Sequence, residues 1–248
     1  MKKSQLLMLQ DIEVLFKIRR FDPDVDTMSR FESFPVQVKG MMTVLDGLLQ
    51  VFEEQDSTLS FRFACREGVC GSCAMFINGS YRLACQTQIR ELKTPEISVN
   101  PLPHLKVIKD LVVDLDPFFN KIEQVMPYLE TLTAPPETEQ VQTQAERKLI
   151  NEVIDCILCG SCYSACPVVW FNKEYLGPAA LTKAYRFVAD SRDGLSPERL
   201  NQVSHEDGIW RCHTVFNCVE ACPKNIQPAD AIEKLRKKTI SRRLKFWK

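Results

Sequence analysis

The 248-residue sequence has no excess of charge of either sign, because its 32 basic residues equal its 32 acidic residues in number. This balance gives no reason to expect a nucleic-acid partner, since proteins that bind nucleic acids usually carry a basic patch. No stretch approaches the roughly 18 consecutive apolar residues of a membrane-spanning helix. The apolar stretch at residues 6–9 is short for a secretory signal and ends at Gln10. We therefore expect a globular protein in a reducing compartment.

The sequence also lacks the motifs that carry most enzymatic chemistry. It contains neither the G-x-G-x-x-G pattern of dinucleotide-binding folds nor a phosphate-binding loop. No nucleophile or acid–base pair stands out, and only three histidines are present. We therefore predict no catalytic residue on this chain and expect any substrate site to lie on a partner.

Cysteine is the residue that this sequence has in excess. An odd total of eleven fits poorly with a simple framework of disulfides. Four cysteines lie between residues 65 and 85, and the other seven lie between residues 156 and 222. Because clustered thiols in a reducing compartment bind metal more often than they form disulfides, we expect two metal-binding zones.

The first zone has the C-x4-C-x2-C…C spacing of plant-type [2Fe-2S] ferredoxins. Small residues, Gly68 and Gly71 among them, allow the tight turns that a loop around a cluster needs. The alternative is a zinc site or a set of buried free thiols. Zinc sites usually pair two short cysteine knuckles, and this zone contains one such pair. We therefore predict a [2Fe-2S] cluster on Cys65, Cys70, Cys73 and Cys85.

The second zone contains two runs of the bacterial ferredoxin type, C-x2-C-x2-C-x3-C-P. The first run, Cys156 to Pro167, matches at every position, whereas the second run, Cys212 to Pro223, has Val215 in place of its second cysteine. In ferredoxins with two clusters, the fourth cysteine of each run ligates the other cluster. This rule predicts a [4Fe-4S] cluster on Cys156, Cys159, Cys162 and Cys222, and a second cluster on Cys166, Cys212 and Cys218.

The second cluster of this zone has three thiolates, because Val215 carries no donor atom. A cubane with one corner left without a ligand can lose that iron, so we predict a [3Fe-4S] cluster. The three sets of four, four and three ligands use all eleven cysteines. The alternative is a labile [4Fe-4S] cluster with water as the fourth ligand, which the spacing alone does not exclude.

The fold class expected from these patterns is α+β, in two domains. Residues 1–110 form the first domain, residues 111–145 connect the domains and include a polar stretch at 131–148 with two prolines, and residues 146–248 form the second. In the first domain, alternating apolar residues predict strands at 12–18, 36–38 and 97–99, apolar spacing after Thr43 predicts a helix, and Asn78-Gly79 predicts a hairpin. In the second, helices are expected at 146–157, 178–190 and 228–243.

Three cluster patterns in this order resemble the iron-sulfur subunit of succinate dehydrogenase and quinol:fumarate reductase. The resemblance rests on CREGVCGSC with Cys85, CILCGSCYSACP and CHTVFNCVEACPKNIQPADAI, supported by PLPHLKVIKDLVVD at residues 101–114, and it covers most of residues 11–240. It implies an N-terminal β-grasp [2Fe-2S] domain of the plant ferredoxin type. It also implies a C-terminal all-α domain of the bacterial ferredoxin type with two clusters.

The resemblance also implies partners and a place in the cell. Family members pass electrons between a FAD-containing flavoprotein subunit and quinone or quinol at membrane anchor subunits, some of which carry haem b. The chain would lie peripherally on the cytoplasmic face of the inner (plasma) membrane. The loop at residues 68–72 would face the flavoprotein, and Pro167, Trp170 and His213 would lie near quinone. Many members have a second tryptophan where this sequence has Phe171, which puts quinone contact at that position in doubt.

Several alternatives stay open from the sequence. The chain also fits the role of an electron-transfer subunit for another flavoprotein system, of the heterodisulfide-reductase or glycolate-oxidase kind. A regulatory protein that senses oxidants ranks last, because no effector-binding module is visible.

The three histidines have open or minor roles. His213 either tunes the potential of the neighbouring cluster or relays a proton, or it is an ordinary surface histidine. His104 and His205 are expected to be structural or exposed. Residues 234–248 contain eight basic residues and no acidic one, with Leu235, Ile240, Leu244 and Trp247 as a rough apolar stripe. This tail predicts contact with anionic lipid or an anchor subunit, or else a solvated helix end.

Overall fold

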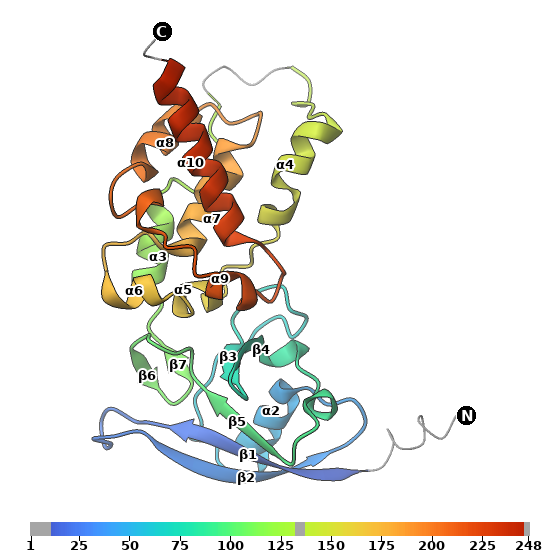
Figure 1. Ribbon diagram of the computed structural model, residues 1–248. Helices are drawn as coiled ribbons and strands as arrows, with labels where there is room; N and C mark the ends of the chain where they lie inside the picture. Colours follow the sequence, from blue (N-terminus) through green and yellow to red (C-terminus); the bar gives the residue numbers. More distant parts are fainter. Residues whose placement is uncertain (1–10, 132–136, 246–248) are drawn as a thin grey trace. The chain divides into compact units, whose positions relative to one another are not determined.

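The computed structural model describes residues 11–131 and 137–245 (Figure 1). The chain divides into two compact units, of which the first comprises Met1–Asp114 with Ile157–Ser161 and the second comprises Leu115–Cys156 with Cys162–Lys248. The short apolar stretch at residues 6–9, the proline pair at 135–136 and Trp247 lie outside the described residues. The second unit thus begins before the second cysteine zone, and a short piece of that zone groups with the first unit.

The first unit is built on one five-stranded mixed sheet. Its strand order is β2-β1-β5-β3-β4, in which β1 pairs antiparallel with β2 and parallel with β5. The bounds are β1 Ile12–Arg20, β2 Arg30–Val38, β3 Ala74–Ile77, β4 Ser80–Leu83, β5 Glu96–Asn100 and helix α2 Val44–Glu54. A mixed sheet that carries one helix is the β-grasp arrangement implied by the resemblance, so this expectation is confirmed.

The strand and helix patterns in the sequence account for the core of this unit. Phe16 and Ile18 of β1 are fully buried, as their alternation predicts. Helix α2 begins after Thr43, whose side chain accepts the N–H of Asp46 while the Asp46 carboxylate accepts the N–H of Thr43. A Cβ atom on Gly47 would lie 2.5 Å from Phe16 Cζ, so glycine lets this helix approach the sheet closely.

The predicted hairpin joins β3 and β4, and its two-residue turn has the expected geometry. Asn78 and Gly79 both have positive φ, at +47° and +76°, as a type I′ turn requires. The same unit also contains two short 3-10 helices and a two-stranded ribbon that the sequence did not indicate: η1 Ala84–Gln86, η2 Ile89–Leu92, β6 Val107–Lys109 and β7 Val112–Val113.

The second unit is helical within the described residues, as expected. Its elements are α3 Asp116–Glu123, α4 Gln144–Ile154, α5 Ser161–Ser164, α6 Pro167–Phe171, α7 Gly177–Val188, α8 Ser196–Val203, η3 Ile209–Arg211, α9 Asn217–Glu220 and α10 Pro228–Lys245. Helix α7 is almost entirely buried and contacts α3, α4, α8 and α10 (Figure 1). The three predicted helices correspond to α4, α7 and α10. The cysteine runs lie between these helices, mostly in loops, with Cys162 in α5 and Cys218 in α9.

Two details of this unit differ from the expectations. The segment 111–145 holds a helix of its own, α3, because Phe118 and Ile122 are buried and the Phe118 ring packs against Tyr163 with centroids 5.4 Å apart. The apolar stripe expected along the tail is also divided, since Leu235 is fully buried while Ile240 and Leu244 are exposed. Leu235 belongs to the core, so the outward apolar surface of α10 is narrower than the sequence suggested.

Candidate metal centres

The first cysteine zone forms a loop whose backbone N–H groups turn inward onto sulfur. Cys65 Sγ accepts hydrogen bonds from the N–H groups of Glu67 at 3.4 Å and of Val69 and Cys70 at 3.3 Å each. Positive φ values at Gly68 (+69°) and Gly71 (+74°) make this wrapping possible. Such N–H groups stabilise thiolates, so the loop suits an anionic cluster.

The electrostatic surroundings of these cysteines change from the surface to the interior. The Ser72 hydroxyl, with backbone hydrogen bonds at Cys65 and Ser72, lowers the pKa of the exposed Cys70 to about 6. Burial raises the pKa of the Cys73 thiol to about 12, and Cys73 Sγ accepts the N–H of Cys85 at 3.5 Å. A metal group that replaces the protons would remove this burial penalty, because it offsets the thiolate charge.

Gly71 brings this loop against the beginning of the second cysteine zone. Residues Ile157–Ser161 belong to the same unit as the loop. A Cβ atom on Gly71 would lie 2.8 Å from the Ile157 carbonyl oxygen and 2.9 Å from Cys159 Cα. The backbones of the two cysteine motifs therefore touch here, with no room for a side chain between them.

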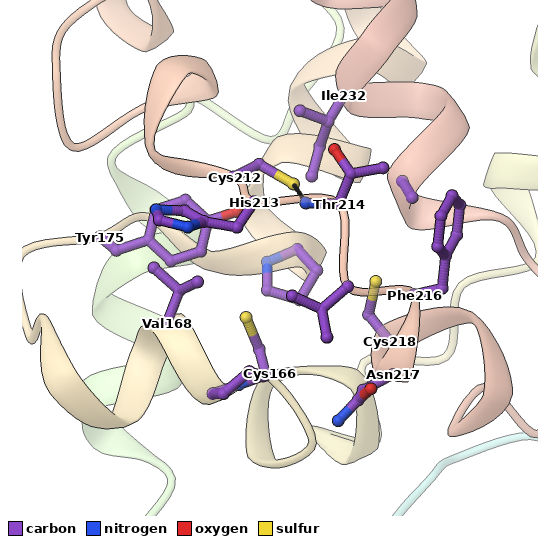
Figure 2. A pocket seen from close by; sticks show the side chains of 14 residues that line it. Cys166, Val168, Tyr175, Cys212, His213, Thr214, Phe216, Asn217, Cys218 and Ile232 are labelled. Carbon is purple, nitrogen blue, oxygen red and sulfur yellow. Dashed lines mark hydrogen bonds between the residues drawn. The ribbon is translucent and has the colours of Figure 1, made fainter.

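Three cysteines from the two bacterial-type runs surround one pocket in the second unit. Figure 2 shows the sulfur atoms of Cys166, Cys212 and Cys218 on different sides of it. Val215, which stands where the motif has a cysteine, lines the same pocket and is 51% exposed. The structure thus brings Cys166 of the first run beside two cysteines of the second run.

The thiols of this pocket are buried near one another and receive backbone donors. Burial, with the charges of Cys166 and Cys212, raises the pKa of Cys218 to about 12. Burial and the charge of Cys212 raise the pKa of Cys166, whereas the backbone N–H groups of Val168 and Val169 lower it. Thr214 N–H donates to Cys212 Sγ at 3.4 Å. Mutual repulsion among buried thiolates favours a cationic iron core between them.

Cys222 lies apart from that pocket and close to the first run. Its pKa is raised by burial and then by the charges of Cys156 and Glu152. Lys183 Nζ donates to the Cys156 carbonyl oxygen at 3.3 Å and so places a positive charge beside this pair. Cys222 therefore has Cys156 of the first run as a neighbour, and Cys166 has Cys212 of the second run.

Two residues that support the three-cysteine pocket gave no indication in the sequence. Arg236 of α10 donates from Nε to the Ile209 carbonyl at 2.9 Å and from Nη2 to the Cys212 carbonyl at 2.7 Å. Tyr175 is buried in the wall of the pocket. The two hydrogen bonds of Arg236 join residues far apart in the chain, and the sequence shows Arg236 only as part of a basic tail.

Of the three residues expected near quinone, two line the three-cysteine pocket and one does not. Pro167 and His213 line the pocket, and His213 is exposed. Trp170 is not among the lining residues, and its indole N–H donates to the Ser164 carbonyl at 2.8 Å. Phe171 is 90% exposed, which leaves its ring available to a partner. His104 and His205 are exposed, in agreement with the minor roles expected for them.

Neither a single-ion metal site nor a membrane-spanning helix is found among the described residues. In residues 11–131 and 137–245, no three His, Cys, Asp or Glu side chains converge closely enough to hold a single metal ion. In a [4Fe-4S] or [3Fe-4S] cluster each thiolate binds a different iron, and in a [2Fe-2S] cluster each iron takes only two of the four thiolates, so the ligands do not converge on one ion. Over the same residues no helix is both long and apolar enough to cross a membrane.

Comparisons with known proteins agree with the geometry. Residues 15–120 match the family model of a 2Fe-2S iron-sulfur cluster binding domain, and residues 148–223 match that of a 4Fe-4S dicluster domain. The mitochondrial succinate dehydrogenase [ubiquinone] iron-sulfur subunit 1 of Oryza sativa subsp. japonica is 46% identical over 90% of this chain and 80% of its own length. The succinate dehydrogenase iron-sulfur subunit of Paracoccus denitrificans is 43% identical over 92% of this chain and 88% of its own length.

A solved structure supports the fold over almost the whole chain. A chain of the Mycobacterium smegmatis Sdh1 complex in the apo form superposes with a TM-score of 0.82 at 26% identity, covering 94% of this chain and 98% of its own. The predicted resemblance, the fold class and the iron-sulfur domains are thereby confirmed. This chain belongs to the family of succinate dehydrogenase iron-sulfur subunits, which are the electron-transfer subunits of a multisubunit oxidoreductase.

Proposed function

We propose that this chain relays electrons between a FAD-containing subunit that acts on succinate or fumarate and quinone at membrane anchor subunits. Three groups of thiols along one chain carry the proposal, because each offers buried sulfur, backbone donors or both to an anionic cluster. The ubiquinone in the name of the rice relative supports quinone as the membrane partner. The proposed chain lies peripherally on the cytoplasmic face of the membrane, beside an anchor that in some family members carries haem b.

The proposed ligand sets follow the spacing and the observed neighbours of each cysteine. Cys65, Cys70, Cys73 and Cys85 hold the [2Fe-2S] cluster; Cys156, Cys159, Cys162 and Cys222 hold the [4Fe-4S] cluster; Cys166, Cys212 and Cys218 hold the [3Fe-4S] cluster. The charge of Cys156 acts on Cys222 and that of Cys212 acts on Cys166, which supports the exchange of fourth cysteines between runs. When bound, these clusters supply one-electron carriers at the positions that the chain fixes.

Exposed residues at two of the sites suggest where the partners bind. Cys70 is exposed and its neighbour Val69 is 62% exposed, so the first loop suits electron exchange with the flavoprotein. Val215 and Phe216, beside the three-cysteine pocket, and Phe171 are exposed apolar side chains. Such residues suit the anchor and a quinone ring, whereas Trp170 serves the fold through its bond to Ser164.

The electron paramagnetic resonance (EPR) spectrum of the air-oxidised complex tests the proposed three-iron cluster. An oxidised [3Fe-4S] cluster is paramagnetic, whereas ordinary oxidised [2Fe-2S] and [4Fe-4S] clusters are silent, so we expect about one spin per chain. In Val215→Cys the pocket gains a fourth thiolate, and the oxidised signal should fall as a [4Fe-4S] cluster forms. A wild-type complex that is silent when oxidised would refute the three-iron assignment and favour the alternative of a labile four-iron cluster.

Two single substitutions separate the ligand sets. Cys222→Ser should lower the reduced [4Fe-4S] signal and preserve the oxidised three-iron signal, while Cys166→Ser should do the opposite. The reverse pattern would show that each run keeps its own fourth cysteine. Co-purification with a flavoprotein other than a succinate or fumarate subunit would instead support the heterodisulfide-reductase-like or glycolate-oxidase-like alternative.

A further inference from the structure

Lys183 brings a positive charge to the beginning of the first bacterial-type run. It belongs to helix α7, which packs against α4, and its own side chain is half-buried. Lys183 Nζ donates to the Cys156 carbonyl oxygen at 3.3 Å across 27 positions of the sequence. Most other residues of α7 are buried, so the lysine extends from a tightly packed helix and its ammonium group is held close to the first cysteine of the run.

The charge of this ammonium group is not neutralised by an ion pair. Among the described residues, no carboxylate pairs with Lys183, whose acceptor is the neutral carbonyl of Cys156. The opposing charge in this region is that of Glu152, which acts on Cys222 and whose carboxylate accepts the N–H of Gln227. A half-buried charge is screened less than one on the surface, so the field of Lys183 extends over the neighbouring thiolates.

Two roles fit this contact, and they depend on different properties of the side chain. The first is structural, because α4 has no basic residue in its last turn and a donor from α7 satisfies the carbonyl just beyond the end of α4. The second is electrostatic. A cluster held by thiolates is anionic and reduction adds one more negative charge, so a nearby positive charge stabilises the reduced state more than the oxidised state. The structural role needs a donor, whereas the electrostatic role needs the charge.

We propose that Lys183 is a positioning residue whose charge, held at the Cys156 carbonyl, raises the redox potential of the cluster on Cys156, Cys159, Cys162 and Cys222. This inference rests on the [4Fe-4S] ligand set of the proposed function. Its consequence is that this carrier accepts an electron more readily than its thiolates and Glu152 alone would allow. The side chain that makes the contribution comes from α7, outside both cysteine runs.

The test is a redox titration of the reduced [4Fe-4S] EPR signal in the complex, comparing wild type with Lys183→Gln. Glutamine keeps an N–H donor for the Cys156 carbonyl and removes the charge. We expect the equilibrium to shift roughly tenfold toward the oxidised cluster, a potential lower by about 59 mV for a one-electron couple. Lys183→Arg keeps the charge, so its potential should equal that of wild type.

Lys224→Gln is the matched control. Lys224 is exposed and follows Cys222 closely in the sequence. Because solvent and salt screen an exposed charge, its removal should shift the equilibrium by about twofold or less.

An unchanged potential in Lys183→Gln, or an equal fall in Lys183→Arg or Lys224→Gln, would overturn the role of Lys183. If Lys183→Gln loses the cluster, Lys183→Met gives the same comparison with a side chain of similar length. Loss of the cluster in both neutral variants would assign Lys183 the structural role and overturn the proposal. Absence of a reduced [4Fe-4S] signal in wild type would instead overturn the proposed ligand set, so the two failures are distinguishable.

Discussion

Replacement of Gly71 by alanine tests the contact between the two cysteine motifs. Gly71 has φ of +74°, a conformation that costs an L-residue about 1 kcal/mol or more. The new Cβ would also lie 2.8 Å from the Ile157 carbonyl oxygen and 2.9 Å from Cys159 Cα. Both neighbours are backbone atoms that cannot rotate away, so overpacking adds roughly 1–3 kcal/mol. Gly71→Ala should therefore destabilise the subunit by about 2–4 kcal/mol.

Gly79→Ala separates the two contributions to this effect. Gly79 has nearly the same φ, +76°, but a Cβ atom added to it at the hairpin tip would meet nothing within 4 Å. The control should therefore lose only about 1 kcal/mol, which reflects the backbone conformation. The difference between the two variants measures the steric contact between Gly71 and the segment of Cys159.

The assay is thermal unfolding at one fixed scan rate, followed by the visible absorption of the clusters, because cluster loss is irreversible. For a chain of this size each kcal/mol lowers the unfolding midpoint by roughly 2–4 °C. We expect a fall of roughly 4–16 °C for Gly71→Ala and roughly 2–4 °C for Gly79→Ala. Equal midpoints in the two variants would refute the close packing of Gly71 against Cys159.

Two further predictions concern the second unit. Arg236→Gln removes the hydrogen bonds to the Ile209 and Cys212 carbonyls and should destabilise the subunit by about 2 kcal/mol. On heating, the oxidised three-iron EPR signal should be lost before the other clusters. Equal loss of all clusters would contradict this prediction. Burial alone would raise the pKa of Asp190, but Arg192 and Arg186 lower it from 3.8 to about 2. The carboxylate should therefore add about 2 kcal/mol above pH 4 that is lost as the pH falls toward 2, and Asp190→Asn should flatten this acid dependence in unfolding experiments.

Local patterns predicted the parts of the fold that local forces determine. The Asn78-Gly79 turn needs two residues that tolerate positive φ, and the dipeptide indicated this directly. The apolar spacing after Thr43 predicted helix α2, and the structure shows that Thr43 caps this helix together with Asp46, three residues further on. The cysteine spacings likewise gave the candidate ligand sets, since the first zone and the first bacterial-type run each place three ligands of one cluster in a short segment, and the second run places two.

Contacts between distant residues were not predictable in this way. The hydrogen bond from Arg236 to the Cys212 carbonyl depends on how α10 packs, which the local sequence does not indicate. Helix α3 is only eight residues long and buries two side chains, too few for a clear helical period. The grouping of Ile157–Ser161 with the first unit arises from the packing at Gly71, which composition does not reveal.

A relay subunit has to reconcile buried sulfur with electron exchange at its surface. The first cysteine zone places Cys73 and Cys85 in the interior and leaves Cys70 exposed. The three-cysteine pocket also combines buried sulfur with an exposed edge, because Cys218 is buried while Val215 and Phe216 are exposed. Burial disfavours thiolates, and donors such as the N–H groups at Cys65 and the Thr214 N–H at Cys212 offset that penalty. We therefore expect the donors to influence how readily each site takes an electron, and the exposed residues to lie where electrons are exchanged with partners.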